Sequence, residues 1–220
     1  MNTQGLIINF LGDSITEGIG VEDVPNNRFD HVLKEMCALK EVRNYGIGGT
    51  RIAHQRRPSV KAWWDLNFCG RAERMDPEAD VVVVFGGTND YGHGDAPLGQ
   101  PGDTGRDTFC GAVRCLMESL VCRYPEAKVV FMTPARRPGD EAPSASPNRY
   151  VPGVPLKDYV DAIKEIGKDF PVAVLDLYAE LGIDPNQESD RTRYTADGVH
   201  FNDAGHRAIA QRLRDFLWSL

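Results

Sequence analysis

Two residue types used in acid–base chemistry stand close together near the end of the chain, in the stretch "YTADGVHFND" over residues 194–203. Asp197 and His200 are three residues apart, so one turn can hold a carboxylate against an imidazole. Three interpretations are open: a helix cap, a pair of metal ligands, or the acid–base half of a catalytic centre. Because a general base needs a group to activate, the third interpretation predicts a nucleophile elsewhere in the chain.

A candidate nucleophile lies in "FLGDSITEG", residues 10–18. Ser14 follows the first apolar run and a glycine that can turn a strand sharply into a helix, which would expose its hydroxyl at the sheet edge. The competing interpretation is that Asp13 or Ser14 only caps a helix. The stretch lacks the GxSxG pattern, so an α/β-hydrolase nucleophile elbow is not indicated.

Two further segments carry groups suited to binding a developing negative charge. "NYGIGGTR" (44–51) contains glycines whose N–H groups can approach a ligand closely, although a tight turn explains them equally well. "GGTND" (86–90) ends the most apolar run of the chain, where the Asn89 amide can donate into a crevice or form an Asx turn.

At this order and spacing, the four segments resemble the SGNH hydrolases, also called the GDSL family of esterases and lipases. The resemblance is carried by "GDSITEG", "NYGIGGT", "GGTND" and "DGVHFND" and spans residues 10–203. It implies a flavodoxin-like α/β/α fold and a serine acyl-hydrolase mechanism that requires no metal or cofactor.

The same resemblance assigns a role to each matching residue. Ser14 is the nucleophile, and Asp197 and His200 complete a catalytic triad. The oxyanion hole consists of the Ser14 N–H, the Gly49 N–H and the Asn89 side chain, with Gly48 as the alternative to Gly49.

Other chemistries fit the sequence less well. A metal centre needs further ligands, but the remaining histidines lack paired spacing: His31, His54, His93 and His206. A nucleotide-binding switch would need GxxxxGK[ST] or GxGxxG after the first apolar run, and neither is present. A non-catalytic binding domain on the same fold is the remaining alternative, because fold does not imply activity.

The elements that must position these residues alternate along the chain. Apolar runs of strand length occupy residues 6–11, 80–87, 127–134 and 171–177, with 42–46 as a weaker fifth candidate. Apolar residues recur at helical spacing over 29–36, 109–120, 156–163 and 209–220. Strands this uniformly apolar are typical of a parallel sheet covered on both faces. The pattern predicts one three-layer α/β/α domain over residues 1–220, with about five parallel strands.

Two stretches fit no element and are predicted to be loops at the carboxyl ends of strands, where open α/β folds bind ligands. They cover residues 91–105 and the proline-rich residues 134–155. Tyr91 and His93 directly follow Asn89 and are candidates for lining a pocket. Trp63 and its neighbour Trp64 could stack on a sugar; the alternative is a helix that buries one tryptophan and half-exposes the other.

The composition of these loops bears on the substrate, because long acyl chains need an extended apolar groove. Both loops are instead rich in glycine, proline and charged residues: Asp95, Asp103, Arg106, Arg136, Arg137, Asp140, Glu141 and Arg149. We therefore expect acetyl or similarly short acyl groups on a polar, carbohydrate-like alcohol. A lysophospholipase or thioesterase acting on longer chains is the alternative.

Bulk composition restricts the partners. The chain is 41% hydrophobic and 26% charged with a net charge of −7, so no broad basic surface for nucleic acid is expected. Arg51, Arg56 and Arg57 form one local basic cluster, either a solvated surface or a contact for an anionic substrate group. Five cysteines without a CxxC pair and an N-terminus without signal-peptide features favour a reduced, cytoplasmic protein. A secreted or periplasmic protein whose signal peptide has been removed would show the same pattern. No apolar stretch is long enough for stable membrane insertion. The sequence makes no prediction of the oligomeric state.

Overall fold

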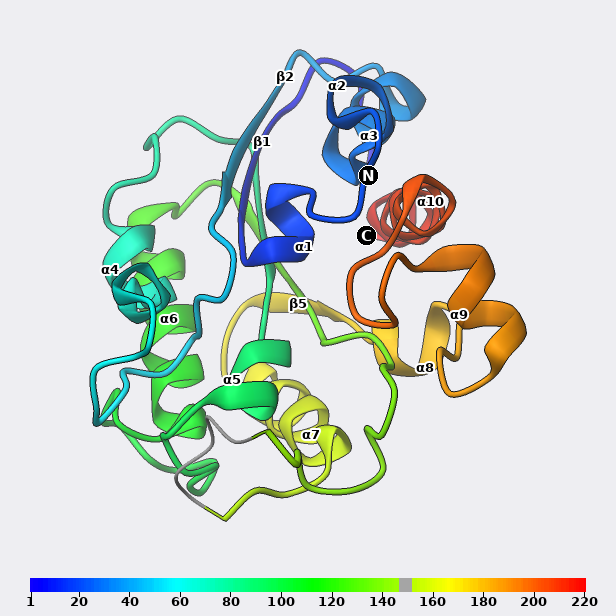
Figure 1. Cartoon of the computed structure of the whole chain (residues 1–220). Helices are drawn as coiled ribbons and strands as arrows, with labels where there is room; N and C mark the ends of the chain where they lie inside the picture. The colour runs from blue at the N-terminus through cyan, green and yellow to red at the C-terminus, as the bar shows by residue number, and fades with distance from the viewer. Residues whose placement is uncertain (147–151) are drawn as a thin grey trace.

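The computed structural model describes residues 1–146 and 152–220 and contains a five-stranded parallel sheet. Its strands are β1 (Ile7–Gly12), β2 (Glu41–Gly46), β3 (Val81–Phe85), β4 (Lys128–Met132) and β5 (Val172–Leu175). The strand order is β2-β1-β3-β4-β5, as in flavodoxin-like folds (Figure 1). All five predicted strands are confirmed, and the weakest candidate is the edge strand β2.

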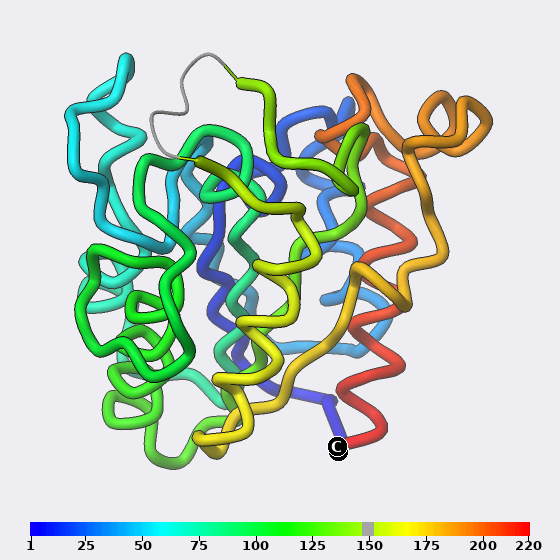
Figure 2. The backbone as a smooth tube through the Cα atoms, turned by 90° about the horizontal axis from the view of Figure 1, so that it is seen from below, coloured from blue at the N-terminus to red at the C-terminus, as the bar shows by residue number. Residues whose placement is uncertain are grey.

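Helices cover both faces of this sheet, which makes three layers (Figures 1 and 2). One face carries α4 (Phe68–Ala72), α6 (Phe109–Arg123) and α7 (Leu156–Gly167). The other carries α3 (Phe29–Cys37) and α10 (Asp203–Ser219), which pack against each other. Because successive strand residues point to opposite faces, β3 supplies Val82 and Val84 to the first core and Val81, Val83 and Phe85 to the second.

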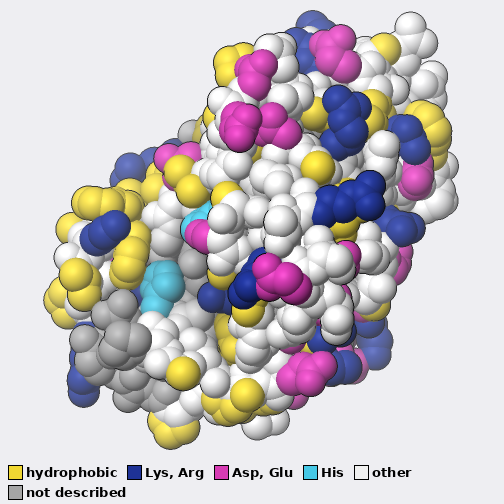
Figure 3. Space-filling model, turned by 45° about the vertical axis from the view of Figure 1, so that its right-hand side comes forward, with side chains coloured by type: hydrophobic (Ala, Val, Ile, Leu, Met, Phe, Trp, Pro, Cys, Tyr) yellow, Lys and Arg dark blue, Asp and Glu magenta, His cyan; other side chains and the backbone are white. Residues whose placement is uncertain are grey.

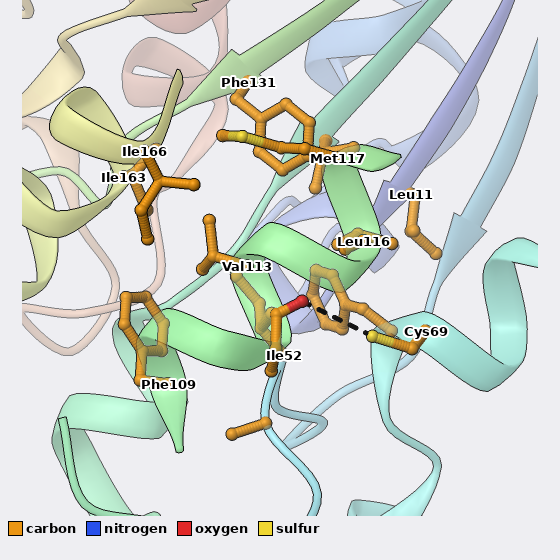
Figure 4. Close-up of a cluster of buried hydrophobic side chains, with 14 of the residues drawn as sticks. Leu11, Ile52, Cys69, Phe109, Val113, Leu116, Met117, Phe131, Ile163 and Ile166 are labelled. Carbon is orange, nitrogen blue, oxygen red and sulfur yellow. Dashed lines mark hydrogen bonds between the residues drawn. The ribbon is translucent and has the colours of Figure 1, made fainter. Parts of the chain in front are cut away.

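The first core is drawn in Figure 4. Apolar side chains of α6 pack with those of β4 and α7: Met117 lies beside Phe131, and Val113 lies near Ile163. On the α4 side of this core, the Cys69 thiol donates to the Ala112 carbonyl oxygen at 3.6 Å. Because helices cover both faces of the sheet, a site can form only at the edge where the strands end and the loops begin.

Four of the predicted helices are confirmed as α3, α6, α7 and α10. Pro155 stands at the N-cap of α7, and α10 begins at Asp203, six residues before its expected first apolar position. The pattern missed the short helices, because four to seven residues are too few to show a period. Besides α4 they are α1 (Ser14–Glu17), α2 (Val24–Asn27), η1 (Ala62–Asp65), α5 (Thr88–His93), α8 (Leu177–Glu180) and α9 (Glu188–Tyr194).

The strand order places the site. The chain turns to opposite sides after β1 and β3, so a crevice opens at their carboxyl ends in the middle of the sheet. Short helices α1 and α5 begin at that edge, directly after β1 and β3. Among the described residues, no helix combines the length and the apolar character needed to cross a membrane.

Candidate active site

Ser14 is the first residue of α1, held at the end of β1 by a tight strand-to-helix turn. Asp13 caps this helix, and its Oδ1 accepts a hydrogen bond from the Ile15 N–H at 3.0 Å. Gly12 allows the turn, because a Cβ at this position would lie 1.9 Å from Thr16 Oγ1. The capping interpretation was therefore right for Asp13, while the Ser14 hydroxyl points elsewhere.

That hydroxyl meets the imidazole of His200, with Ser14 Oγ and His200 Nε2 3.0 Å apart. On the other side of the ring, His200 Nδ1 lies 2.7 Å from Asp197 Oδ2. Three side chains from the two ends of the sequence thus form one hydrogen-bonded row. A serine, a base and a carboxylate in this order have the geometry used to activate a hydroxyl for attack.

The turn that carries Asp197 and His200 is fixed by its own backbone. Asp197 Oδ1 accepts from the N–H groups of Val199 and His200 at 2.9 and 2.8 Å, as in an Asx turn. Thr195 and Phe201 close the turn as an isolated antiparallel bridge. Burial alone would raise the pKa of Asp197, but the hydrogen bonds from His200 and Val199 outweigh it and hold the pKa below its ordinary value. Asp197 is therefore an anion that faces the imidazole.

The glycine-rich loop after β2 runs beside Ser14. Gly48 donates its N–H to Glu17 Oε2 at 2.7 Å, so this N–H is already used. Gly49 has a positive φ of 79°, and a Cβ there would lie 2.0 Å from Trp64 Nε1. Of the two glycines considered from the sequence, Gly49 is the one whose N–H is not committed to Glu17. Glu17 was missed as a site residue, although its place three residues after Ser14 in "GDSITEG" puts both on one helix face.

Asn89 is the second residue of α5, directly after β3. Its Nδ2 donates to the Thr50 carbonyl oxygen at 3.0 Å, which ties α5 to the loop after β2. Asp90 strengthens this tie by accepting from the N–H groups of Ile52 and Ala53 at 3.0 and 2.9 Å. An amide nitrogen has two hydrogens, so Asn89 keeps one donor for the crevice.

These residues line one cavity of about 650 Å³, within the range of small-molecule sites. Figure 3 shows a hollow in the surface with histidine side chains visible inside it. It is lined by Ser14, Gly48, Gly49, Asn89, Asp197 and His200, of which Ser14 and Asn89 are buried and Asp197 is half-exposed. Trp63 and Trp64 of η1 also line it, with the Lys61 ammonium group 5.5 and 5.3 Å from their ring centroids.

Three interpretations of individual residues need correction. Tyr91 does not line this cavity: it is buried in the first core, and its hydroxyl donates to the carbonyl oxygens of Gly139 and Ala142. Arg51 is not a solvated surface residue, since it is buried and paired with Asp65 at 2.8 Å. The short helix η1 half-exposes Trp63, as one interpretation expected, but it does not bury Trp64 in the core: Trp64 is only partly buried and its ring lies tilted against His93.

The two long loops differ in their contribution. Residues 94–108 supply nothing to the cavity, because they fold back onto the start of α6, where Thr108 caps the helix. The second loop supplies Arg137 and Ser144–Ser146, and Arg137 is a cavity residue that the sequence offered only as one charge among several. Arg149 lies outside the described residues.

The candidate site is built from oxygen and nitrogen groups that hydrogen-bond to each other. Within residues 1–146 and 152–220, no three histidine, cysteine, aspartate or glutamate side chains come together as a set that could hold a metal ion. The hydrogen-bonded row of Ser14, His200 and Asp197 has the groups that a hydroxyl nucleophile and its base would need.

Comparison with known proteins agrees with this arrangement. A model of the GDSL-like Lipase/Acylhydrolase family matches residues 10–208. A solved protein from Lactobacillus plantarum is 30% identical, with a TM-score of 0.82 over 98% of each chain. A carbohydrate acetylesterase family member from Sinorhizobium meliloti is 16% identical, with a TM-score of 0.65 over 97% of this chain and 98% of that one. A member of the lipolytic protein G-D-S-L family from Veillonella parvula is 17% identical, with a TM-score of 0.61 over 97% and 99%.

The comparison with curated proteins gave no match. The two structures below 20% identity support the fold alone, whereas the family model covers nearly the whole chain and all four motifs. The protein therefore belongs to the GDSL-like lipase/acylhydrolase family, whose members are ester-hydrolysing enzymes.

Proposed function

We propose that this protein is a serine esterase that removes short acyl groups from a polar, carbohydrate-like alcohol. The observation that carries the catalytic part is the row from Ser14 Oγ through His200 to Asp197, with contacts of 3.0 and 2.7 Å. His200 Nε2 takes the hydroxyl proton as Ser14 attacks the ester carbonyl, and later returns it to the leaving alcohol. Asp197, held ionised, stabilises the imidazolium between these two transfers.

The oxyanion formed by this attack has to be stabilised by hydrogen-bond donors that face the former carbonyl oxygen. We assign this role to the N–H groups of Ser14 and Gly49 and to the Asn89 amide, because all three residues line the cavity. Each preorganised donor of this kind contributes roughly 10²–10³ in rate. The Gly48 N–H is not included among these donors, because it already donates a hydrogen bond to Glu17 Oε2.

The substrate part rests on the cavity wall. The loop of residues 134–146 is tied to α5 at several points: Arg137 donates to Thr88, Tyr91 to Gly139 and Ala142, and Ser144 to Gly92. A loop held in place by these hydrogen bonds does not readily open into the apolar groove that a long acyl chain requires. The described wall also presents hydroxyl and cationic groups beside the two tryptophans, which suits a sugar better than a lipid tail: Lys61, Arg137, Ser144 and Ser146. The similarity to a protein called a carbohydrate acetylesterase family member adds support.

The catalytic assignment is tested with a fluorophosphonate probe and the variant Ser14→Ala. The wild type should be labelled at Ser14, and Ser14→Ala should lose labelling and several orders of magnitude of kcat with an unchanged fold. A purified, folded Ser14→Ala that keeps more than about a hundredth of wild-type turnover would disprove Ser14 as the nucleophile.

The substrate assignment is tested with nitrophenyl esters of increasing chain length. Each buried methylene would add about 0.8 kcal/mol if an apolar groove existed, so kcat/KM is a sensitive measure of one. We expect the acetate to be hydrolysed best and kcat/KM to fall through butyrate to octanoate. A steady rise toward octanoate would replace the short-acyl proposal with a lysophospholipase or thioesterase activity while leaving the catalytic row untouched.

A further inference from the structure

Behind the proposed oxyanion donor Asn89 lies a hydrogen-bonded row of two more side chains. His93 Nε2 is 3.2 Å from Asn89 Oδ1, one helical turn away in α5. The other ring nitrogen, Nδ1, is 3.3 Å from Arg51 Nη1, which also donates to the His93 carbonyl oxygen. The row therefore runs from Arg51 through His93 to Asn89 and ends at the cavity.

The direction of every hydrogen in this row follows from Arg51. A guanidinium group is always charged and only donates, so His93 Nδ1 must accept. Neutral His93 then carries its hydrogen on Nε2 and donates it to Asn89 Oδ1. Burial, reinforced by the charges of Arg51 and Arg137, lowers the pKa of His93 to about 4, which keeps the ring in this neutral form. Because Asn89 Oδ1 accepts, Nδ2 has to face the Thr50 carbonyl oxygen and the cavity.

Contacts of Arg51 and of the His93 ring hold the row from Arg51 through His93 to Asn89 in place. Arg51 is buried, with 3% of its side chain exposed, and its Nη2, which has two hydrogens to donate, lies within hydrogen-bond distance of Ser59 Oγ, the Trp64 carbonyl oxygen and Asp65 Oδ1. The Trp64 ring lies against the His93 ring, with centroids 4.5 Å apart and the planes tilted by 32°. Both nitrogens and one face of the His93 ring are thus occupied, which leaves little of it to bind a substrate even though it borders the cavity.

We propose that His93 and Arg51 are positioning residues: they select the orientation of the Asn89 amide that points N–H at the oxyanion, and they polarise it toward donation. This rests on the proposed function of Asn89. His93 does line the cavity, as the sequence analysis expected, and the positioning role explains what it does there. Without His93, only the Thr50 carbonyl oxygen still favours this orientation, and an amide turned the other way presents its oxygen to the cavity, where it repels the developing negative charge.

A double-mutant cycle on Asn89 and His93 tests this, with kcat and KM measured on nitrophenyl acetate. We expect Asn89→Ala to lower kcat by about 100-fold and His93→Phe by about 10-fold, each with little change in KM. In the Asn89→Ala background, His93→Phe should cost nothing further, because no amide is left to orient. His93→Phe keeps an aromatic ring against Trp64, so the stack is retained.

His93→Gln is the rescue variant and also covers the case in which phenylalanine is not tolerated. Its amide nitrogen can donate to Asn89 Oδ1, so it should recover most of the activity lost in His93→Phe. The exposed His54, with the change His54→Gln, is the control and should keep wild-type kcat.

The outcomes separate two failures. Equal losses from His93→Phe in both backgrounds, or a loss confined to KM, would overturn the positioning role and leave Asn89 in the oxyanion hole. An Asn89→Ala variant with near wild-type kcat would overturn the oxyanion assignment and the positioning role together, while fluorophosphonate labelling of Ser14 would still report on the nucleophile.

Discussion

Asp13 is buried directly before Ser14, and this burial raises the pKa of its carboxyl group from 3.8 to about 6. The Ile15 N–H and the charges of His200 and Arg71 act in the opposite direction and limit the rise. The carboxyl group of the folded protein therefore binds its proton more tightly than that of the unfolded chain. Its contribution to stability is fully present below pH 3.8 and is lost as the pH rises through about 6.

We predict that Asp13→Asn stabilises the protein at pH 8, by up to roughly 3 kcal/mol. The amide removes the buried charge and keeps an oxygen that can accept from the Ile15 N–H. Urea unfolding of the two proteins at pH 8 and at pH 4 measures the difference, which should be near zero at the lower pH. A gain that is the same at both values would mean that the charge of Asp13 is not its origin.

At the scale of elements, the site depends on how closely the loop after β2 approaches η1. Gly49 has no space for a side chain, since Trp64 occupies the position of its Cβ, and its φ of 79° is unfavourable for other residues. The packing of this loop against η1 brings Gly49 and the two tryptophans into the wall of the cavity that Ser14 also lines. One contact therefore links the proposed oxyanion donor Gly49 to the tryptophans.

Gly49→Ala should accordingly lower both kcat and stability. A positive φ alone costs about 1–2 kcal/mol in a non-glycine residue, and the overlap with Trp64 adds to it. Gly182→Ala is the matched control, because Gly182 has a similar φ of 73° with nothing within 4 Å of its Cβ position. Thermal and urea unfolding should show a larger loss for Gly49→Ala, and only this variant should lose activity. Equal losses of stability would rule out the contact with Trp64 as the cause.

For the molecule as a whole, α10 joins the site to the second core. His206 lies in this helix, fully buried, and its Nδ1 accepts from the Phe29 N–H at 3.2 Å at the start of α3. Burial is the main reason that the pKa of His206 is lowered from 6.5 to about 4. The neutral ring thus contributes stability that is present above pH 6.5 and is lost as the pH falls toward 4.

We predict that His206 causes part of the acid sensitivity of the whole fold. At pH 5, the loss from this residue alone should be about 2 kcal/mol relative to pH 7. His206→Asn keeps an acceptor near the Phe29 N–H and does not titrate, so its unfolding free energy should fall less between pH 7 and pH 5. His54→Asn, at an exposed position, should behave as wild type. A variant His206→Asn with the pH dependence of the wild type would place the acid sensitivity elsewhere.

Much of this protein could be predicted from the sequence, because the decisive signals are local. Four apolar runs predicted β1, β3, β4 and β5, since a strand covered on both faces is largely apolar, while the edge strand β2, which is only partly buried, gave a weaker signal. Asp197 and His200 could be paired in advance because three residues form one turn. The family was predictable because "GDSITEG", "NYGIGGT", "GGTND" and "DGVHFND" are short segments whose order along the chain is itself distinctive.

Other features were decided only by the tertiary structure, because they depend on contacts between distant segments. Tyr91 and His93 are two residues apart, and the sequence predicted a loop there, but both lie in α5, where one enters the core and the other joins Arg51 and Asn89. The sequence presented Arg51 as a charge beside Arg56, but the approach of Asp65 buries it. Which side chains are buried, and which residues they contact, depends on which surfaces meet when the sheet and the helices pack. A local pattern of residue types does not contain this information.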